Sequence, residues 1–311
     1  MTTLHFVGFY QFVNYDQNIW IQEHRPVPPS IDIQNLVIRY GKFVAVDQLS
    51  FQVNTGEIFG LLGPNGAGKT TTFLCLTRQV PIHSGSIQLL GLNLQTQFDA
   101  IKPRFGYVPD TDNHFDEFTA FQNLKLFADL YQVNHDRIDH CLELVELIRA
   151  KYLPVRTFSK GMKKKLLIAR ELLHEPELLL LDEPTANLDV HSTELIRKLI
   201  LDLAKRGTTI LITTHNMGEV EQICDRVAII NHGRLINLDT PTAFKVRHTE
   251  RIVDVVLERG NTHERLAVKL DDEEARQDLA RILNSEVPVT LHTREFNFYQ
   301  AFLKLTGEEY N

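Results

Sequence analysis

The sequence has no run of about 18 or more apolar residues, the length that a helix needs to cross a bilayer. It has only three cysteines (Cys75, Cys141 and Cys224), with no Cys-x-x-Cys pair and no histidine pair beside them. Their odd number and wide spacing argue against a disulfide framework and against a zinc site. A reducing, cytosolic setting fits this cysteine usage, and any role in transport needs a membrane partner on another chain.

The sequence also has fewer basic than acidic residues, 33 Lys and Arg against 40 Asp and Glu. The net charge is −7 and the pI is near 6.0, which argues against a protein built to coat nucleic acid or anionic lipid. The first 30 residues lack a basic start, so we do not expect a secretory signal. With 311 residues, 43% of them hydrophobic, the chain is long enough for one large globular domain and an appendage.

Composition and patterning divide the chain into three parts. Residues 1–30 form an aromatic arm that ends in a proline-rich linker; we interpret it as a loose extension or a misassigned start, with a docking arm as the alternative. In residues 31–245 strands alternate with helices, which predicts an α/β domain with a parallel sheet. Residues 246–311 predict a small α+β module, and residues 250–311 carry 8 basic and 13 acidic side chains.

Short apolar runs and their spacing predict the individual elements. Alternation and buried runs predict strands, and apolar residues at helical spacing predict helices. In the large domain we expect strands at 31–39, 43–53, 58–62, 178–181 and 208–214, and helices within 138–148 and 192–207. In the C-terminal module we expect strands at 252–257 and 287–292 and helices at 272–283 and 296–305.

A glycine-rich loop lies between an apolar strand and a helix, the context that identifies a phosphate-binding loop. Its backbone N–H groups close around an anion, and the helix presents its N-terminus to the phosphates. We expect Lys69 to reach the β- and γ-phosphates, Thr70 to ligate Mg²⁺ and Thr71 to donate to the α-phosphate. This loop alone does not choose among kinases, GTPases and ATPases. It consists of Gly63, Pro64, Asn65, Gly66, Ala67, Gly68, Lys69 and Thr70 and matches G-x-x-x-x-G-K-[ST].

Two acids and a histidine end two further strands. Asp182 and Glu183 follow the apolar run Leu178–Leu181, and burying such a pair is costly without partners, so a simple acidic turn is the weaker reading. Asp182 is placed to hold Mg²⁺ and Glu183 to polarise an attacking water, which would make the site hydrolytic. His215 ends the next strand, where it is either structural or a donor to the γ-phosphate.

Another helix begins just after Ser159 and Gly161, and Ser159 is a good N-cap. The lysines at 163–165 in this helix are interpreted as a solvated face. With the segment Phe158–Met162 the sequence resembles the ATP-binding-cassette (ABC) family, whose signature reads Leu-Ser-Gly-Gly-Gln. The order of the motifs matches from Ile31 to about Pro241, roughly two thirds of the chain.

This resemblance implies a P-loop NTPase fold of the ABC type, with an antiparallel β-subdomain and a helical subdomain beside a mixed or parallel sheet. It implies that Tyr40 stacks on adenine, that Glu183 is the catalytic base and that His215 is a switch. Ser159 and Gly161 should bind the γ-phosphate of ATP held by a second copy, and the loop ending at Asp189 should cross to that copy. ATP would then join two cassettes, and hydrolysis would release them.

Two departures from the family pattern stand out. Asp110 follows Gly-Tyr-Val-Pro where the family has glutamine, and it is a further candidate ligand for Mg²⁺ or its water. Lys160, with Phe158 and Met162, replaces residues of the usual signature. We expect nucleotide binding and hydrolysis to survive both departures, because Glu183 and His215 are present.

The resemblance is closest to stand-alone ATPases of type-2 exporters, which pair with a separate membrane permease. It therefore implies an ATP- and Mg²⁺-dependent ATPase at the cytoplasmic face of the membrane, with a permease and a second cassette, identical or paralogous, as partners and no nucleic acid. One alternative is a soluble ABC ATPase that acts on the ribosome or DNA. Another, suggested by Asp110 and Lys160, is a regulatory cassette that scarcely hydrolyses ATP.

Overall fold

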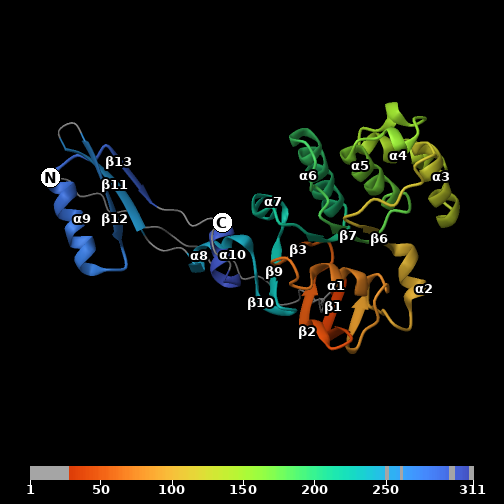
Figure 1. Ribbon diagram of the computed structural model, residues 1–311, viewed down its shortest axis with the longest axis horizontal. Helices are drawn as coiled ribbons and strands as arrows, with labels where there is room; N and C mark the ends of the chain where they lie inside the picture. Colours follow the sequence, from red (N-terminus) through yellow and green to blue (C-terminus); the bar gives the residue numbers. More distant parts are fainter. Residues whose placement is uncertain (1–27, 249–251, 260–261, 294–297, 308–311) are drawn as a thin grey trace, which may run out of the picture.

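The computed structural model describes residues 28–248, 252–259, 262–293 and 298–307 (Figure 1). The predicted N-terminal arm lies outside the described residues except for its last three. There Ser30 is buried, and its hydroxyl lies 2.8 Å from the hydroxyl of Thr209. No helix within the described ranges is long and apolar enough to cross a membrane.

The central sheet has six strands, which are β3 (Ile58–Leu62), β6 (Phe105–Val108), β7 (Leu178–Asp182), β8 (Thr209–Thr213), β9 (Arg226–Asn231) and β10 (Arg234–Asp239). Their order across the sheet is β10-β9-β3-β8-β7-β6. All neighbours are parallel except β10, which pairs antiparallel with β9. The strands β3, β7 and β8 are buried along their whole length because other elements cover both faces of the sheet, as is usual for parallel sheets.

A second, antiparallel sheet covers one face of the central sheet. It contains β1 (Ile31–Tyr40), β2 (Phe43–Val53), β4 (Ser84–Leu89) and β5 (Leu92–Asn93) in the order β2-β1-β4-β5. Helix α1 (Lys69–Leu76) buries its apolar side chains in the same core as these strands, beside Phe59 of β3. The packing fixes the N-terminus of α1, and the loop before it, at the carboxyl edge of the central strands.

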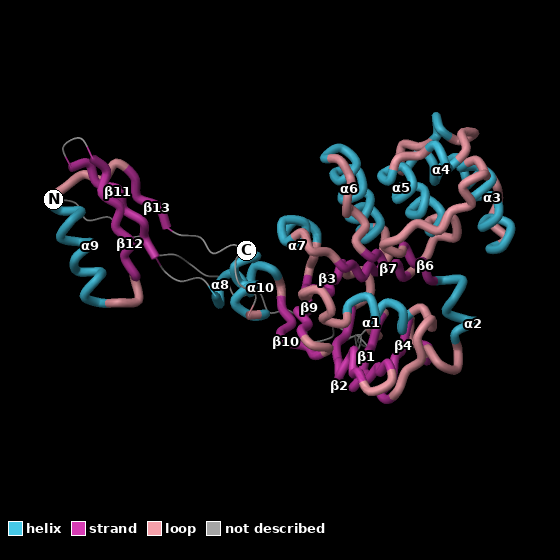
Figure 2. The backbone as a smooth tube through the Cα atoms, in the orientation of Figure 1, coloured by secondary structure: helices cyan, strands magenta, loops and turns pink. Residues whose placement is uncertain are grey.

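Helices cover the other face, and a short helix, α2 (Phe98–Ile101), precedes β6. A helical subdomain of α3 (Ala120–Tyr131), α4 (Asp136–Leu144) and α5 (Lys160–Glu171) lies beside β6 and β7 in Figure 2. The remaining helices of this face are α6 (Val190–Lys205), α7 (Met217–Ile223), α8 (Pro241–His248) and α10 (Phe298–Thr306). All of these except α2 contribute to one apolar core with the central sheet.

The C-terminal region forms a third, three-stranded sheet, called here the accessory sheet. Its strands are β11 (Ile252–Arg259), β12 (Thr262–Lys269) and β13 (Thr290–Thr293) in the order β12-β11-β13, and α9 (Glu273–Ser285) packs on one face. This unit lies apart from the two larger sheets in Figure 1. The chain then returns, and α10 packs against α7 and α8.

The predicted α/β class and ABC-type architecture are confirmed, and each predicted strand and helix is present with shifts of a few residues at its ends. Strands β4, β5, β6, β10 and β12 were not predicted; in β12 six of the eight residues are exposed. The prediction that the lysines at 163–165 form a solvated face was wrong, because Lys164 and Lys165 are each only 7% exposed. The division of the chain at residues 30 and 245 stays a prediction, and the structure adds that α10 shares the core of the large domain.

Candidate nucleotide-binding site

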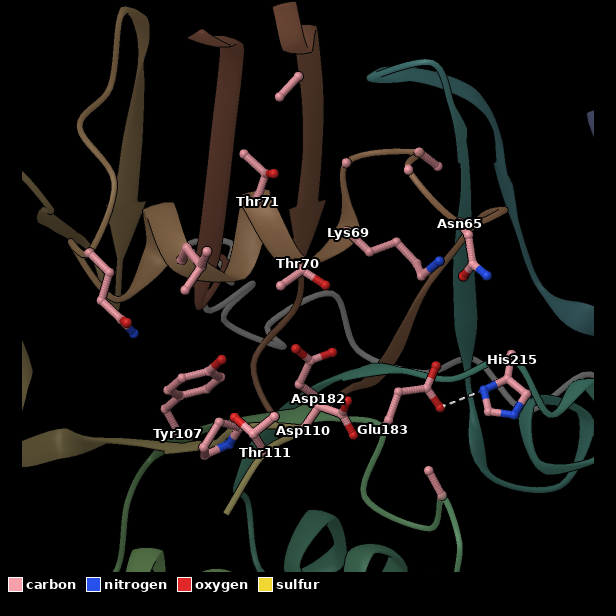
Figure 3. A pocket seen from close by; sticks show the side chains of 18 of the residues that line it. Asn65, Lys69, Thr70, Thr71, Tyr107, Asp110, Thr111, Asp182, Glu183 and His215 are labelled. Carbon is pink, nitrogen blue, oxygen red and sulfur yellow. Dashed lines mark ion pairs between the residues drawn. The ribbon is translucent and has the colours of Figure 1, made fainter. Parts of the chain in front are cut away.

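A cleft of about 1020 Å³ opens at the carboxyl edge of the central sheet (Figure 3). Parallel strands bring their carboxyl ends to one edge, which is where α/β folds commonly bind ligands. Of the predicted site residues, the cleft gathers Tyr40, Asn65, Gly66, Ala67, Gly68, Lys69, Thr70, Thr71, Asp110, Asp182, Glu183 and His215.

The phosphate loop is held from behind by the turn between β9 and β10. The N–H of Gly233 donates to the carbonyl of Ala67 at 2.9 Å. A Cβ on Gly63 would lie 2.2 Å from the carbonyl oxygen of Ile230, so only glycine fits there. Lys69 donates from Nζ to the carbonyls of Gly63 and Pro64, which keeps its ammonium inside the loop. Gly63 and Pro64 themselves therefore support the cleft without lining it.

Asp182 and Glu183 stand at the end of β7, as the sequence predicts. The hydroxyl of Thr213, on the neighbouring strand, donates to Asp182 Oδ1 at 2.5 Å. The backbone N–H of Glu183 bonds to the carbonyl and the hydroxyl of Thr213 at 3.1 and 3.2 Å. Burial raises the pKa of both carboxyls, and the contacts with Thr213 and His215 oppose that shift.

Glu183 adopts a backbone conformation that is rare for a side chain of its size. Its φ is +49°, in the left-handed region, where residues cluster at functional sites. Its carboxylate Oε2 lies 2.9 Å from Nδ1 of His215, so the two side chains form an ion pair across the ends of β7 and β8 (Figure 3). The His215 ring is largely exposed to the cleft.

Asp110 lies at the end of β6 and is joined to the signature helix α5. Lys164 of α5 donates from Nζ to the carbonyls of Pro109 and Asp110 at 3.0 and 2.8 Å, and lies 3.7 Å from the Asp110 carboxylate. Burial lowers the pKa of Lys164, while the nearby carboxylates oppose the shift. Lys163 pairs with Asp116 in the same loop at 2.9 Å. Two of the three lysines therefore bind the loop after β6 to α5.

Several residues that line the cleft were not predicted from the sequence. Arg170 of α5 is buried and donates to the side chain of Asn113 at 2.8 Å. Burial, aided by two nearby carboxylates, raises the pKa of Tyr107 to about 12, so its hydroxyl stays protonated. The only sequence signal for any of these residues was that Tyr107 lies three positions before Asp110 in the same segment. The missed lining residues include Phe43, Gln79, Tyr107, Thr111, Asn113 and Arg170.

Ser159, Gly161 and Asp189 do not line the cleft. Ser159 caps α5 by accepting from the N–H of Met162 at 3.2 Å, as predicted. Asp189 caps α6 by accepting from the N–H of Ser192 at 2.9 Å. The loop before Asp189 packs on the signature, since a Cβ on Gly161 would lie 3.3 Å from Leu188. These residues form a second surface beside α5.

The cleft has the groups that a magnesium nucleotide needs. Thr70 and Asp182 face each other across it in Figure 3, and hydroxyl and carboxylate oxygens are preferred Mg²⁺ donors. Lys69 and the backbone of residues 65–70 supply donors for phosphate oxygens. Tyr40 is 47% exposed at one end, where its ring offers a flat face to a base.

Comparison with known proteins agrees with this geometry. Residues 46–186 match the ABC transporter family. The chain is 35% identical over 282 residues to a fluoroquinolones export ATP-binding protein of Mycobacterium tuberculosis, covering 90% of this chain and 94% of that protein. The chain belongs to the ABC transporter family of ATP-binding proteins. This ABC protein is also 39% identical over 217 residues to Nod factor export ATP-binding protein I of Ralstonia nicotianae, covering 68% of each.

Solved structures of the family share the fold of this ABC ATPase. A structure described as an ATP-binding subunit of an ABC transporter matches with a TM-score of 0.65 and 28% identity, over 70% of this chain and 92% of that one. The protein cbiO1 of Clostridium perfringens matches with a TM-score of 0.62 and 28% identity, over 70% and 90%. The chain is thus an ABC ATPase, an enzyme that hydrolyses ATP.

Proposed function

We propose that this ABC ATPase drives an exporter, with a separate membrane permease as its partner and ATP with Mg²⁺ as its substrate. The relatives named above are export ATP-binding proteins, and the likeness covers most of both chains for the protein from M. tuberculosis. A peripheral position at the cytoplasmic face of the membrane follows from this role. A soluble ABC ATPase that acts on the ribosome or DNA is the less favoured reading.

We further propose that two copies share each nucleotide. The observation that carries this proposal is the separation of the site into two surfaces, with Ser159 and Asp189 capping helices outside the cleft that holds Lys69. A helix N-terminus carries partial positive charge and free N–H groups, so the start of α5 suits the γ-phosphate held by a second copy. The partner cassette is either an identical chain or a paralogue.

Within the cleft each side chain has a distinct task. Lys69 and the loop would bind the phosphates, and Thr70 and Asp182 would hold Mg²⁺, which would neutralise charge that develops on the phosphates. Glu183 would accept a proton from the attacking water, and its contact with His215 fixes the carboxylate for that task. His215 would donate to the γ-phosphate, and Asp110 would offer a further oxygen to Mg²⁺ or to a water bound by it.

The test of this proposal compares phosphate release and assembly in the purified chain with Mg²⁺ and saturating ATP. Replacing Glu183 by Gln should lower the rate at least about 10²-fold, the usual share of a general base. The same variant should elute as an ATP-bound dimer in size-exclusion chromatography. Equal rates in the two proteins would show that Glu183 is not the base.

A matched pair of substitutions tests the shared nucleotide. Aspartate is a good N-cap, so Ser159→Asp keeps α5 capped while it sets a negative charge against the γ-phosphate. Thr119 caps α3 away from the cleft and serves as the control. In the Glu183→Gln background, Ser159→Asp should abolish the ATP-dependent dimer and Thr119→Asp should retain it. An ATP-bound dimer that survives Ser159→Asp would refute the shared site.

A further inference from the structure

Helix α10 ends the described chain, yet it packs into the large domain rather than into the accessory sheet. Phe298 and Phe302 are buried, at 0% and 4% exposure. The Phe298 ring meets Phe244 of α8 edge-on, with 5.6 Å between ring centroids. Burial of these two side chains stabilises the contact, because apolar surface gains free energy when it is removed from water. The contact between α10 and α8 is therefore a stable part of the fold.

Glu221 joins α10 to helix α7. Its Oε1 accepts from the backbone N–H of Phe298 at 2.8 Å, so a side chain of α7 caps the first residue of α10. Its Oε2 also lies 3.2 Å from Nζ of Lys245 in α8. The helix that carries Glu221 begins at Met217, directly after the N-cap Asn216, which follows His215. A displacement of α10 would thus move the helix that begins two residues after His215.

The other end of α10 reaches the phosphate loop by a separate route. The side chain of Asn231 donates to the carbonyl of Thr306 at 3.1 Å. Asn231 opens the turn between β9 and β10, and Gly233 in that turn bonds to Ala67 of the phosphate loop. Arg234, the first residue of β10, pairs with Asp47 of β2 at 2.6 Å. Two separate paths therefore run from α10 to the nucleotide cleft, one to the segment that carries His215 and one to the phosphate loop.

We propose that α10 is a regulatory helix, which holds α7 and the β9–β10 turn in place and so links the accessory sheet to the nucleotide site. The accessory sheet lies between α8 and α10 in the sequence, so each of its ends continues into one of the two packed helices. Coupling between two sites is reciprocal: nucleotide in the cleft must change the stability of α10 as much as α10 changes the site. This inference rests on the role given to His215 in the proposed function.

Substitution of Glu221 in the full chain tests the path through α7. Glu221→Leu removes the acceptor for the Phe298 N–H, whereas Glu221→Gln retains an oxygen in the same place. We expect Glu221→Leu to lower kcat at least five-fold with less than a two-fold change in the affinity for ATP, and Glu221→Gln to stay within two-fold of the unaltered chain. Gln222→Leu, on the same helix but paired with Arg197, is the matched control and should stay within two-fold.

Hydrogen exchange in the full chain gives a second readout, which does not require ATP to be hydrolysed. Saturating ATP, in the Glu183→Gln background, should slow exchange at least five-fold at the amides of α7 and α10, and Glu221→Leu should abolish the effect at α10 alone. Unchanged exchange at α10, or an unchanged kcat in Glu221→Leu, would overturn the inference. If the chain binds ATP without hydrolysing it, the proposed function fails, and the exchange response at α10 still decides this inference.

Discussion

The hydroxyl of Thr213 donates to Asp182 Oδ1 at 2.5 Å, and its oxygen, Thr213 Oγ1, accepts from the backbone N–H of Glu183 at 3.2 Å. One buried side chain on β8 thus orients both acids at the end of β7. The second contact also holds Glu183 in its left-handed conformation. The positions of the Asp182 and Glu183 carboxylates, which have different proposed tasks, therefore both depend on an uncharged threonine.

Thr213→Val keeps the shape of the side chain and removes its hydrogen bonds. Losing a hydrogen bond to a charged group costs about 1.5–3 kcal/mol, so we expect kcat to fall about 10- to 100-fold. Binding of Mn²⁺ with ATP, followed by magnetic resonance, should weaken in the same variant. Thr213→Ser, which keeps the hydroxyl, should remain near the unaltered rate; a similar loss in both variants would point to packing instead.

Lys164→Met should destabilise the large domain. The substitution leaves the carbonyls of Pro109 and Asp110 without their buried donor, which costs about 1–3 kcal/mol. Lys160→Met is the control, because Lys160 is exposed at the start of the same helix and surface changes usually stay within about 0.5 kcal/mol. Urea denaturation measures both. Equal stabilities would mean that Lys164 contributes nothing to the contact between α5 and the loop after β6.

Gly63→Ala should abolish tight nucleotide binding, because its Cβ would lie 2.2 Å from a backbone oxygen that cannot retreat without shifting β9. Gly91→Ala provides the comparison: its φ is +75° with no atom near the added Cβ. It should cost about 1–2 kcal/mol of stability through conformation alone and leave binding intact. Titration with a fluorescent ATP analogue separates the two, and undiminished binding in Gly63→Ala would contradict the close approach seen here.

Acid should destabilise the fold partly through His174. Its Nε2 lies 3.1 Å from the carbonyl of Phe105, and its buried Nδ1 has no hydrogen-bond partner within the described residues. Burial lowers the pKa of His174 below its usual 6.5, so below pH 6.5 the unfolded chain binds the proton more readily than the folded one. The free energy of unfolding should therefore decrease as the pH falls from 7 to 5. His174→Phe should reduce that decrease, and an identical pH dependence in both proteins would rule this contribution out.

Sequence patterns sufficed where the physical signal is local. The runs Ile58–Leu62 and Leu178–Leu181 are apolar throughout because both faces of their sheet are covered, and the structure has strands there. The loop between β3 and α1 was predicted for a similar reason, since closing a backbone around phosphate demands glycine at fixed places. Ser159 was also predicted as a helix cap, which depends only on its neighbours.

Contacts between distant segments left no such signal. Lys164 and Lys165 have the sequence of an exposed charged face. Lys164 is buried against the loop after β6, whereas Lys165 lies 3.8 Å from Glu146, beyond the end of α4. Thr213 is one of two threonines in β8, and nothing in the sequence sets it opposite Asp182. Strand β12 shows no apolar alternation because six of its eight residues are exposed, which leaves too few buried positions to form a pattern.

The return of the chain to α10 has a consequence for how the protein would respond to proteases. A nick in the turn at residues 270–272, between β12 and α9, would divide the chain into two fragments. The smaller fragment would still be held by the pairing of β13 with β11 and by the burial of Phe298 and Phe302 beside α8. Two bands on a denaturing gel should accordingly coincide with a single species on a native column, whereas a terminal appendage would be shed.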